Sequence, residues 1–230
     1  MRFFPRGLWP VVLVLGSASL LAAQGLRQPL VAKREFAPQQ LVPPPPAPGS
    51  PALALEMARL RSVIAGASPQ RLAQAQFDGE HEDPSVFSAA IGRDITRLPA
   101  TLALLQFIQQ QTEQVIDEAK QQFKAPRPYY LDPSLPHCGK GVHTLGSYPS
   151  GHAGFAYSVG AALARLDPAH APAVLVRAED YALSREVCGV HFHIDTEASR
   201  AIGIHIADML LADPSLENLV KAARAELADH

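Results

Sequence analysis

Three short segments, far apart in the sequence, hold most of the side chains that could do chemistry. They contain Lys120 and Arg127; Ser150, Gly151 and His152; and Arg185, His191 and Asp195. Lysine and arginine neutralise phosphate oxygens, and the planar guanidinium group can bind two of them at once. Histidine supplies a nucleophile or a proton donor. The set of residues therefore predicts a site for a phosphate ester.

The middle segment is typical of an anion site at the start of a helix. Ser150, Gly151 and His152 directly precede a run of small and apolar residues that is predicted to be helical. Backbone N–H groups at a helix N-terminus are unpaired, and the helix dipole favours negative charge there. Gly151 lets a ligand approach the backbone closely. We expect Ser150 and Gly151 to bind phosphate, with His152 beside them.

The last segment supplies a nucleophile. His191 and Asp195 are four positions apart, so in a helix they lie on one face. A carboxylate bonded to one imidazole nitrogen fixes the tautomer and leaves the other nitrogen free to attack. His152 would protonate the leaving oxygen and then activate water as a base. These roles predict hydrolysis of phosphomonoesters through a phosphohistidine on His191.

Three cations are expected to surround the phosphoryl group, namely Lys120, Arg127 and Arg185. Their charge would stabilise the equatorial oxygens, which stay highly charged through the transition state. Because fixed cations can supply the electrostatic role of a metal ion, the sequence predicts a metal-independent enzyme with no cofactor.

The elements that must position these residues are predicted to be helical. Apolar residues recur at spacings of three, four and seven, and period-two alternation is rare. Pro99 suits a first helical turn, Pro126 ends the helix before it, and Asp213 before Pro214 predicts a cap. Helices are predicted over residues 52–64, 99–125, 152–166, 171–185, 195–211 and 214–228. The length fits one domain, so we predict an all-α, single-domain helical bundle.

The N-terminal residues indicate export. Residues 1–23 have a positive start and an apolar stretch ending in small residues, which predicts a signal peptide and a periplasmic location. An uncleaved membrane anchor is the alternative, although the stretch is short for a span. The proline-rich residues 24–51 predict an extended arm packed along the domain, with a recognition motif for another protein as the alternative. The helical catalytic domain is expected over residues 52–230.

Charge and cysteine content limit the partners and the compartment. The formal net charge is -2 and there is no polybasic run, so a nucleic acid polymer is not an expected partner. The expected partners are small-molecule phosphomonoesters, without stable membrane insertion after signal removal; a homo-oligomer stays open. In an oxidising compartment Cys138 and Cys188 are candidates for a disulfide, with two free thiols as the alternative.

Together, the three segments resemble the signature of the type 2 phosphatidic acid phosphatase superfamily, which includes the vanadium haloperoxidases. The chain also resembles the class A bacterial non-specific acid phosphatases. The blocks that carry this second resemblance are LVPPPPAPGS at 41–50, FSAAIG at 87–92, GSY at 146–148 and SREVCGVH at 184–191. The resemblance implies an all-helical periplasmic phosphomonoesterase of low selectivity at acid pH, with phosphotransferase activity as an additional capacity.

The same resemblance implies roles for individual residues. It places seven around the phosphate: Lys120, Arg127, Ser150, Gly151, His152, Arg185 and His191. It also implies that Asp195 orients His191. Three positions depart from the usual pattern, Tyr129, Ala182 and His193, and they affect the expected pocket shape and pH profile.

Other functions would use some of the same residues. His191, His193 and Asp195 form an H-x-H-x-D spacing that binds zinc in some hydrolases, although a catalytic zinc site needs further ligands. A vanadate-dependent haloperoxidase would use the same cations, because vanadate mimics phosphate. A phosphate-binding module without turnover would not need two histidines. Ser158 lies in a variant serine-nucleophile motif, but the surrounding pattern is helical, whereas that motif must follow a strand.

Overall fold

The computed structural model describes residues 40–141 and 143–228, so the predicted signal peptide (residues 1–23) and the first part of the predicted arm lie outside the described residues. The α-helices are α2 (Pro51–Gly66), α3 (Pro69–Glu80), α4 (Pro99–Phe123), α5 (Pro128–Leu131), α6 (Gly151–Leu166), α7 (Ala171–Val187), α8 (His193–Leu211) and α9 (Glu217–Ala228). The 3-10 helices are η2 (Pro84–Phe87), η3 (Ile95–Arg97) and η4 (Pro214–Leu216). The described residues contain an isolated bridge but no strand, so the predicted all-α class is confirmed. Each described helix is too short or too polar to serve as a membrane span.

The helix boundaries follow from local chemistry. α2 and α3 each begin with a proline after a capping serine, Ser50 and Ser68, whose hydroxyl accepts a backbone N–H. α4 begins at a proline, as predicted, and ends before Lys124, whose φ of 48° is left-handed. The prediction of one helix over 214–228 was wrong in part. The segment is a 3-10 turn capped by Asp213 and then α9.

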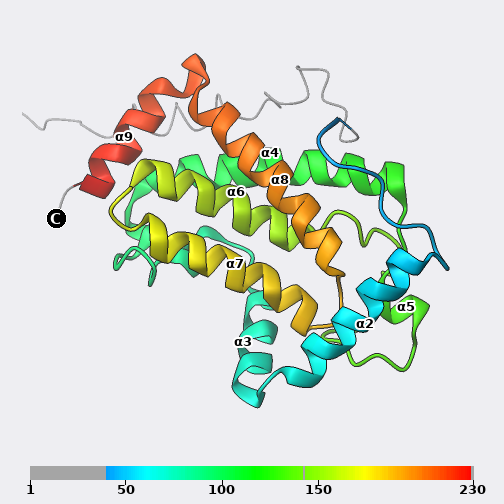
Figure 1. Cartoon of the computed structure of the whole chain (residues 1–230). Helices are drawn as coiled ribbons and strands as arrows, with labels where there is room; N and C mark the ends of the chain where they lie inside the picture. Colours follow the sequence, from blue (N-terminus) through cyan, green and yellow to red (C-terminus); the bar gives the residue numbers. More distant parts are fainter. Residues whose placement is uncertain (1–39, 142, 229–230) are drawn as a thin grey trace, which may run out of the picture.

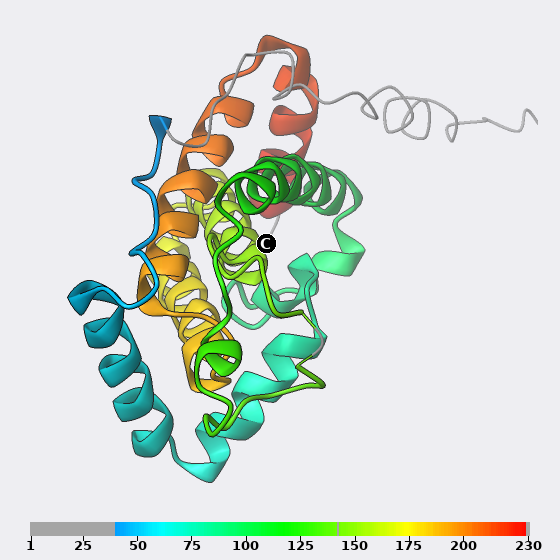
Figure 2. The same ribbon diagram turned by 90° about the vertical axis from the view of Figure 1, so that its right-hand side faces the viewer.

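α6 is the central helix of the bundle. α4, α7 and α8 pack around it, and α9 packs against α4 (Figures 1 and 2). α3 lies on α7, and α2 contacts α7 and α8 at one end of the bundle (Figure 1). Most residues of α6 are buried, which explains why its sequence is apolar on every face.

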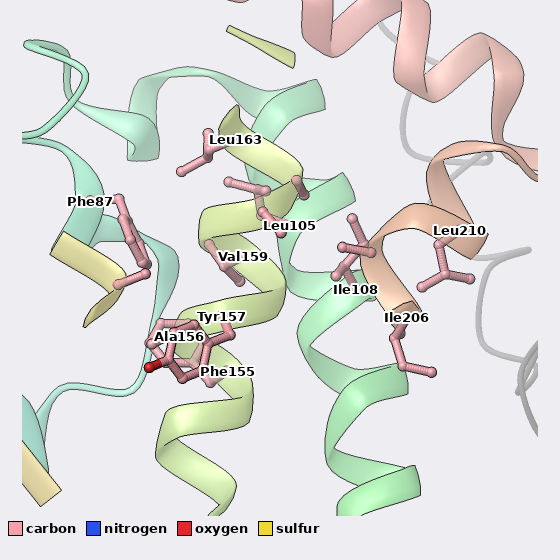
Figure 3. Close-up of a cluster of buried hydrophobic side chains, with 14 of the residues drawn as sticks. Phe87, Leu105, Ile108, Phe155, Ala156, Tyr157, Val159, Leu163, Ile206 and Leu210 are labelled. Carbon is pink, nitrogen blue, oxygen red and sulfur yellow. The ribbon is translucent and has the colours of Figure 1, made fainter. Parts of the chain in front are cut away.

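The main core surrounds α6 with large side chains, both towards α4 and α8 and towards η2 and α7. They include Phe87, Leu105, Ile108, Phe155, Val159, Leu163, Ile206 and Leu210 (Figure 3). α6 and α8 approach closely because a glycine lies at their contact: a Cβ on Gly203 would be 2.9 Å from the carbonyl oxygen of Gly154. This close approach brings together the start of α6, which carries His152, and the start of α8, which carries Asp195.

The described part of the proline-rich arm packs along the domain. Val42 is buried in the main core, and the Pro43 carbonyl accepts a hydrogen bond from the Tyr148 hydroxyl at 2.6 Å. Pro45 lines a small internal cavity together with Asp195. The expectation that the arm covers its own domain therefore holds for these residues.

Candidate active site

The three chemistry-bearing segments meet in one cavity of about 500 Å³. Its wall includes Lys120, Arg127, Gly151, His152, Arg185 and His191. These residues come from the last turn of α4, the link to α5, the start of α6, the end of α7 and the residues before α8. The close packing of α4, α7 and α8 around α6 brings these chain segments to a single place.

Two of the cations are positioned by the end of α4 and the link after it. Lys120 lies in the last turn, with Nζ 3.6 Å from Asp117 Oδ1. The backbone N–H of Arg127 donates to the Thr144 carbonyl at 2.9 Å, which pairs the link with the segment before α6. The guanidinium group of Arg127 then reaches the third segment, where Nη1 lies 2.6 Å from His191 Nε2.

The two arginines of the cavity carry charge that suits an anion. The Nε atoms of Arg127 and Arg185 and the Nη1 atom of Arg185 are buried without a hydrogen-bond partner among the described residues. Arg185 packs against the end of α3, where a Cβ on Gly79 would lie 2.7 Å from Nη1. These three atoms are covered by protein, but both arginines line the cavity, where their charge suits a phosphate ligand.

The start of α6 is held by α8. Ser150 is fully buried, its hydroxyl accepts from Ala153 N at 3.4 Å as the helix cap, and its carbonyl accepts from Ser199 Oγ at 2.7 Å. The hydroxyl accepts this capping bond and still has its own hydrogen to donate, and Gly151 and His152 form the cavity wall at this point. A Cβ on Gly151 would lie 3.2 Å from Lys120 Nζ, so glycine keeps this wall open.

His191 and Asp195 form a buried pair, although the stretch that joins them is not one continuous helix. α8 begins only at His193, so His191 precedes it. Asp195 lies in the first turn, and its Oδ2 accepts from Phe192 N at 2.9 Å and from Ser147 Oγ at 2.6 Å. The same oxygen lies 3.3 Å from His191 Nδ1. The pair forms because the Asp195 side chain points back from the first turn of α8 towards the residues that precede the helix.

These contacts define the tautomer of His191. The Arg127 guanidinium can only donate, so Nε2 of His191 carries the lone pair and Nδ1 carries the hydrogen that faces Asp195. Burial, followed by the charges of Arg127 and Arg185, lowers the pKa of His191 well below its ordinary value. Burial raises the pKa of Asp195 to about 7, and the hydrogen bonds from Ser147 and Phe192 oppose that increase. Nε2 of the neutral His191 thus carries the lone pair that a nucleophile needs, and in this structure that lone pair accepts from Arg127.

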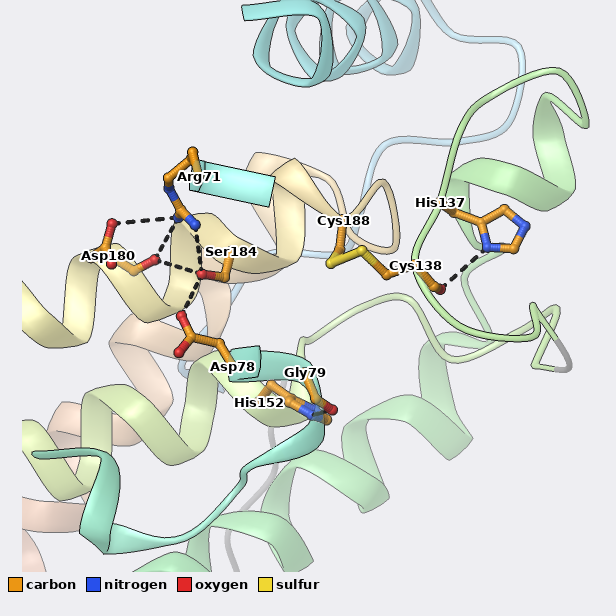
Figure 4. Close-up of a disulfide and its surroundings, with 9 residues drawn as sticks. All are labelled: Arg71, Asp78, Gly79, His137, Cys138, His152, Asp180, Ser184 and Cys188. Atoms are coloured by element: carbon orange, nitrogen blue, oxygen red, sulfur yellow. Dashed lines mark hydrogen bonds and ion pairs between the residues drawn. A yellow bond between two sulfur atoms is a disulfide. The ribbon is translucent and has the colours of Figure 1, made fainter. Parts of the chain in front are cut away.

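His152 lies between the end of α3 and the cavity. Its Nε2 is 3.3 Å from the Gly79 carbonyl oxygen (Figure 4), and its Nδ1 is 3.4 Å from Glu82 Oε2. Burial, followed by the charge of Arg185, lowers the pKa of His152 to about 3. Glu82 and Ser147 are site residues that the sequence reasoning missed. No motif marks Glu82, whereas Ser147 lies in the GSY block before the second segment.

A disulfide between Cys138 and Cys188 borders the cavity (Figure 4). Cys188 follows Arg185 by three positions, and Cys138 lies in the long connection between α5 and α6. The Cys138 N–H also donates to the Cys188 carbonyl at 2.9 Å. The bridge therefore ties this connection to the end of the helix that carries Arg185.

Replacing Cys138 and Cys188 together with serine is expected to destabilise the protein. The bridge spans a sequence separation of 50 residues, and closing a loop of that size in the unfolded chain contributes about 4 kcal/mol. For a protein of this length, the loss corresponds to a decrease in Tm of roughly 8–16 °C. Thermal unfolding followed by circular dichroism measures it. Reductant should lower the Tm of the wild type to that of the double variant; an unchanged wild-type Tm would argue against the bridge.

Two alternative sites do not assemble. Nδ1 of His193 lies 3.0 Å from Glu186 Oε1, and both line a different cavity, so the H-x-H-x-D residues diverge. Among the residues that the structure describes, no group of three His, Cys, Asp or Glu side chains is arranged to hold a metal ion. Ser158 is buried inside α6, where its hydroxyl donates to the Phe155 carbonyl at 3.2 Å.

Comparison with known proteins gives a consistent result. Residues 95–215 match the PAP2 superfamily. An acid phosphatase of Zymomonas mobilis is 31% identical over 193 residues, which cover 80% of this chain and 73% of that enzyme. A non-specific acid phosphatase of Providencia stuartii is 26% identical over 82% of this chain and 79% of its own length.

Solved structures share the fold. Aquifex aeolicus LpxE has a TM-score of 0.58 at 18% identity, covering 69% of this chain and 96% of its own. The first transmembrane PAP2 type phosphatidylglycerolphosphate phosphatase from Bacillus subtilis has a TM-score of 0.56 at 14% identity, covering 84% of this chain and 90% of its own. At these identities the likeness concerns the helical architecture alone.

Proposed function

The chain belongs to the PAP2 superfamily and is an acid phosphatase, and we propose that it hydrolyses small phosphomonoesters through a phosphohistidine on His191. One contact supports the mechanism most directly. His191 Nε2, the atom with the lone pair, lies 2.6 Å from Arg127 Nη1, in the cavity that Arg185 also lines. A nucleophile beside fixed cations in one cavity is the arrangement that phosphoryl transfer requires.

In the first step His191 Nε2 attacks phosphorus as the bond to the leaving oxygen breaks. His152 gives its proton to that oxygen, so the product leaves as an alcohol. In the second step water attacks the phosphohistidine, His152 takes the proton from water, and the N–P bond breaks to release phosphate. Lys120, Arg127 and Arg185 bind the equatorial oxygens throughout. An alcohol in place of water would accept the phosphoryl group, which is the route to phosphotransferase activity.

The charges in the cavity favour activity at acid pH. His191 must be neutral to attack, and its lowered pKa keeps it neutral in acid. His152 must be protonated in the first step, although in the anion-free cavity burial and the charge of Arg185 lower its pKa to about 3. A phosphate dianion between the cations cancels part of their field, so it raises this pKa. Activity should therefore fall as the pH rises through the pKa of the donor.

Export to the periplasm is the second part of the proposal. The predicted signal peptide supports it, and so does the disulfide, because such bridges persist in oxidising compartments. N-terminal sequencing of the mature protein from a periplasmic fraction checks both. A mature protein that starts at Met1 in the cytosolic fraction would argue against export.

Hydrolysis of p-nitrophenyl phosphate, measured across pH with a metal chelator present, tests the catalytic proposal. We expect activity with an acidic optimum that the chelator does not reduce. Rapid quenching with radiolabelled substrate should trap a phosphoenzyme. The label should then be lost from the protein in acid, because a phosphorus–nitrogen bond hydrolyses in acid. Turnover that depends on added metal, or full activity without a phosphoenzyme, would contradict the mechanism.

A further inference from the structure

We propose that Glu82 is a further catalytic residue, which shares with His152 the single proton that the leaving group receives. The proposal deepens the proposed function and rests on it. It assigns the acid–base role to the Glu82–His152 pair on the cavity wall instead of to His152 alone. Glu82 lies outside the three segments that the sequence analysis identified.

The geometry of His152 determines which nitrogen exchanges the proton. Its Nε2 lies 3.3 Å from the Gly79 carbonyl oxygen, which can only accept. Nε2 of the neutral ring therefore carries the hydrogen, and Nδ1 carries the lone pair. Nδ1 lies 3.4 Å from Glu82 Oε2, so in a neutral pair the carboxyl group holds the proton that faces this lone pair. Glu82 and His152 both line the cavity.

The backbone on each side of the Glu82 side chain is fixed. The Tyr181 hydroxyl on α7 donates to the His81 carbonyl at 2.8 Å, and Gln109 Nε2 on α4 donates to the Glu82 carbonyl at 3.0 Å. α3, which precedes this segment, is tied to α7 by Asp78, which accepts from Ser184 Oγ (Figure 4). These contacts hold Glu82 beside His152 from two different helices.

The electrostatic environment favours a neutral pair that holds one proton. Burial raises the pKa of Glu82 to about 7, Glu113 adds to this increase, and Arg185 opposes it. Burial, with Arg185 next, lowers the pKa of His152 to about 3. The charged and titratable groups that face the pair are Glu113, Asp117 and Lys120 from α4, Tyr181 and Arg185 from α7, Arg127 from the link after α4, and His191.

The Glu82–His152 pair donates a proton in the first step and accepts one in the second. As the His191 Nε2–phosphorus bond forms and the ester bond breaks, the proton held between Glu82 and His152 passes to the leaving oxygen. The pair is then deprotonated, and it removes one proton from the water that attacks the phosphohistidine. Phosphate leaves, His191 recovers its lone pair, and the Glu82–His152 pair regains its proton.

The test compares two leaving groups in Glu82→Gln at pH 5. Glutamine keeps the shape of the side chain and an N–H donor towards Nδ1, but it has no proton to transfer. A p-nitrophenolate leaves without a proton, whereas the alkoxide of glycerol 2-phosphate needs one. We expect kcat/KM for glycerol 2-phosphate to fall about 10²-fold and that for p-nitrophenyl phosphate to fall less than about threefold. Glu82→Asp should restore part of the loss.

The matched control is Glu80→Gln, which removes an exposed carboxylate two positions earlier in the chain, outside the cavity wall. It should leave the kcat/KM for both substrates unchanged. Combining Glu82→Gln with His152→Ala should be no worse than His152→Ala alone, because the two residues act as a unit. The proposal that Glu82 and His152 share the proton would be overturned by equal losses of kcat/KM on both substrates in Glu82→Gln, or by additive losses in the double variant. Failure of the phosphohistidine appears separately, as hydrolysis that survives His191→Ala.

Discussion

Replacing His191 with alanine is expected to reduce kcat for p-nitrophenyl phosphate by at least about 10³-fold, towards the uncatalysed background. The variant lacks the atom that forms the bond to phosphorus. Lys120, Arg127 and Arg185 remain, so inorganic phosphate should still bind and inhibit, and no phosphoenzyme should be trapped. Steady-state kinetics, rapid-quench labelling and phosphate binding by calorimetry provide the three measurements.

A second histidine–carboxylate pair supplies the control. His170 Nδ1 lies 2.7 Å from Asp167 Oδ2 in the connection between α6 and α7, away from the cavity wall. His170→Ala should keep wild-type turnover while removing an equivalent contact. Hydrolysis in His191→Ala at the level of the control would reject covalent catalysis at this residue.

Replacing Asp195 with asparagine is expected to lower kcat by up to about 10⁴-fold, the loss seen when the carboxylate that orients a catalytic histidine is changed to an amide. The amide group can present N–H instead of oxygen to His191 Nδ1, which favours the tautomer with hydrogen on Nε2 and removes the lone pair from the attacking atom. Steady-state kinetics at the optimum pH measures the loss.

The fold of the Asp195→Asn variant needs its own measurement, because Asp195 also accepts from Ser147 and from the Phe192 N–H. The control is Asp208→Asn on the same helix, whose carboxylate pairs with Arg165 at the surface. It should keep activity and Tm. If the Asp195→Asn variant lost stability but its folded fraction kept the wild-type kcat, the role of Asp195 would be structural only.

The sequence predicted the members of the cavity better than it predicted the reasons for their positions. The spacing of four between His191 and Asp195 would put them on one face only in a continuous helix, whereas the pair forms across the start of α8. Ser150 was predicted to bind phosphate, and its hydroxyl caps α6. In each case the residue type was informative, but the local conformation depends on how α6 and α8 meet, which periodicity does not describe.

The parts that the sequence did not predict depend on contacts between distant segments. α3 buries only Ala75 and Asp78, so it lacks the long apolar stripe by which α4 was predicted. Glu82 follows α3 in a stretch without a motif. Its proximity to His152 arises because α3 packs on α7 and its last residues reach the start of α6. Such proximity is a property of tertiary packing alone.

The proline-rich segment packs near Asp195, the member of the His191–Asp195 pair that does not line the active-site cavity. Val42 inserts into the core, Pro43 receives the Tyr148 hydroxyl, and Pro45 closes a pocket against Asp195. These contacts place the stretch beside Asp195, whose side chain is buried. We expect a protease cut or an engineered junction between Val42 and Pro45 to loosen these contacts, and so to alter the surroundings of Asp195 from outside the helical bundle.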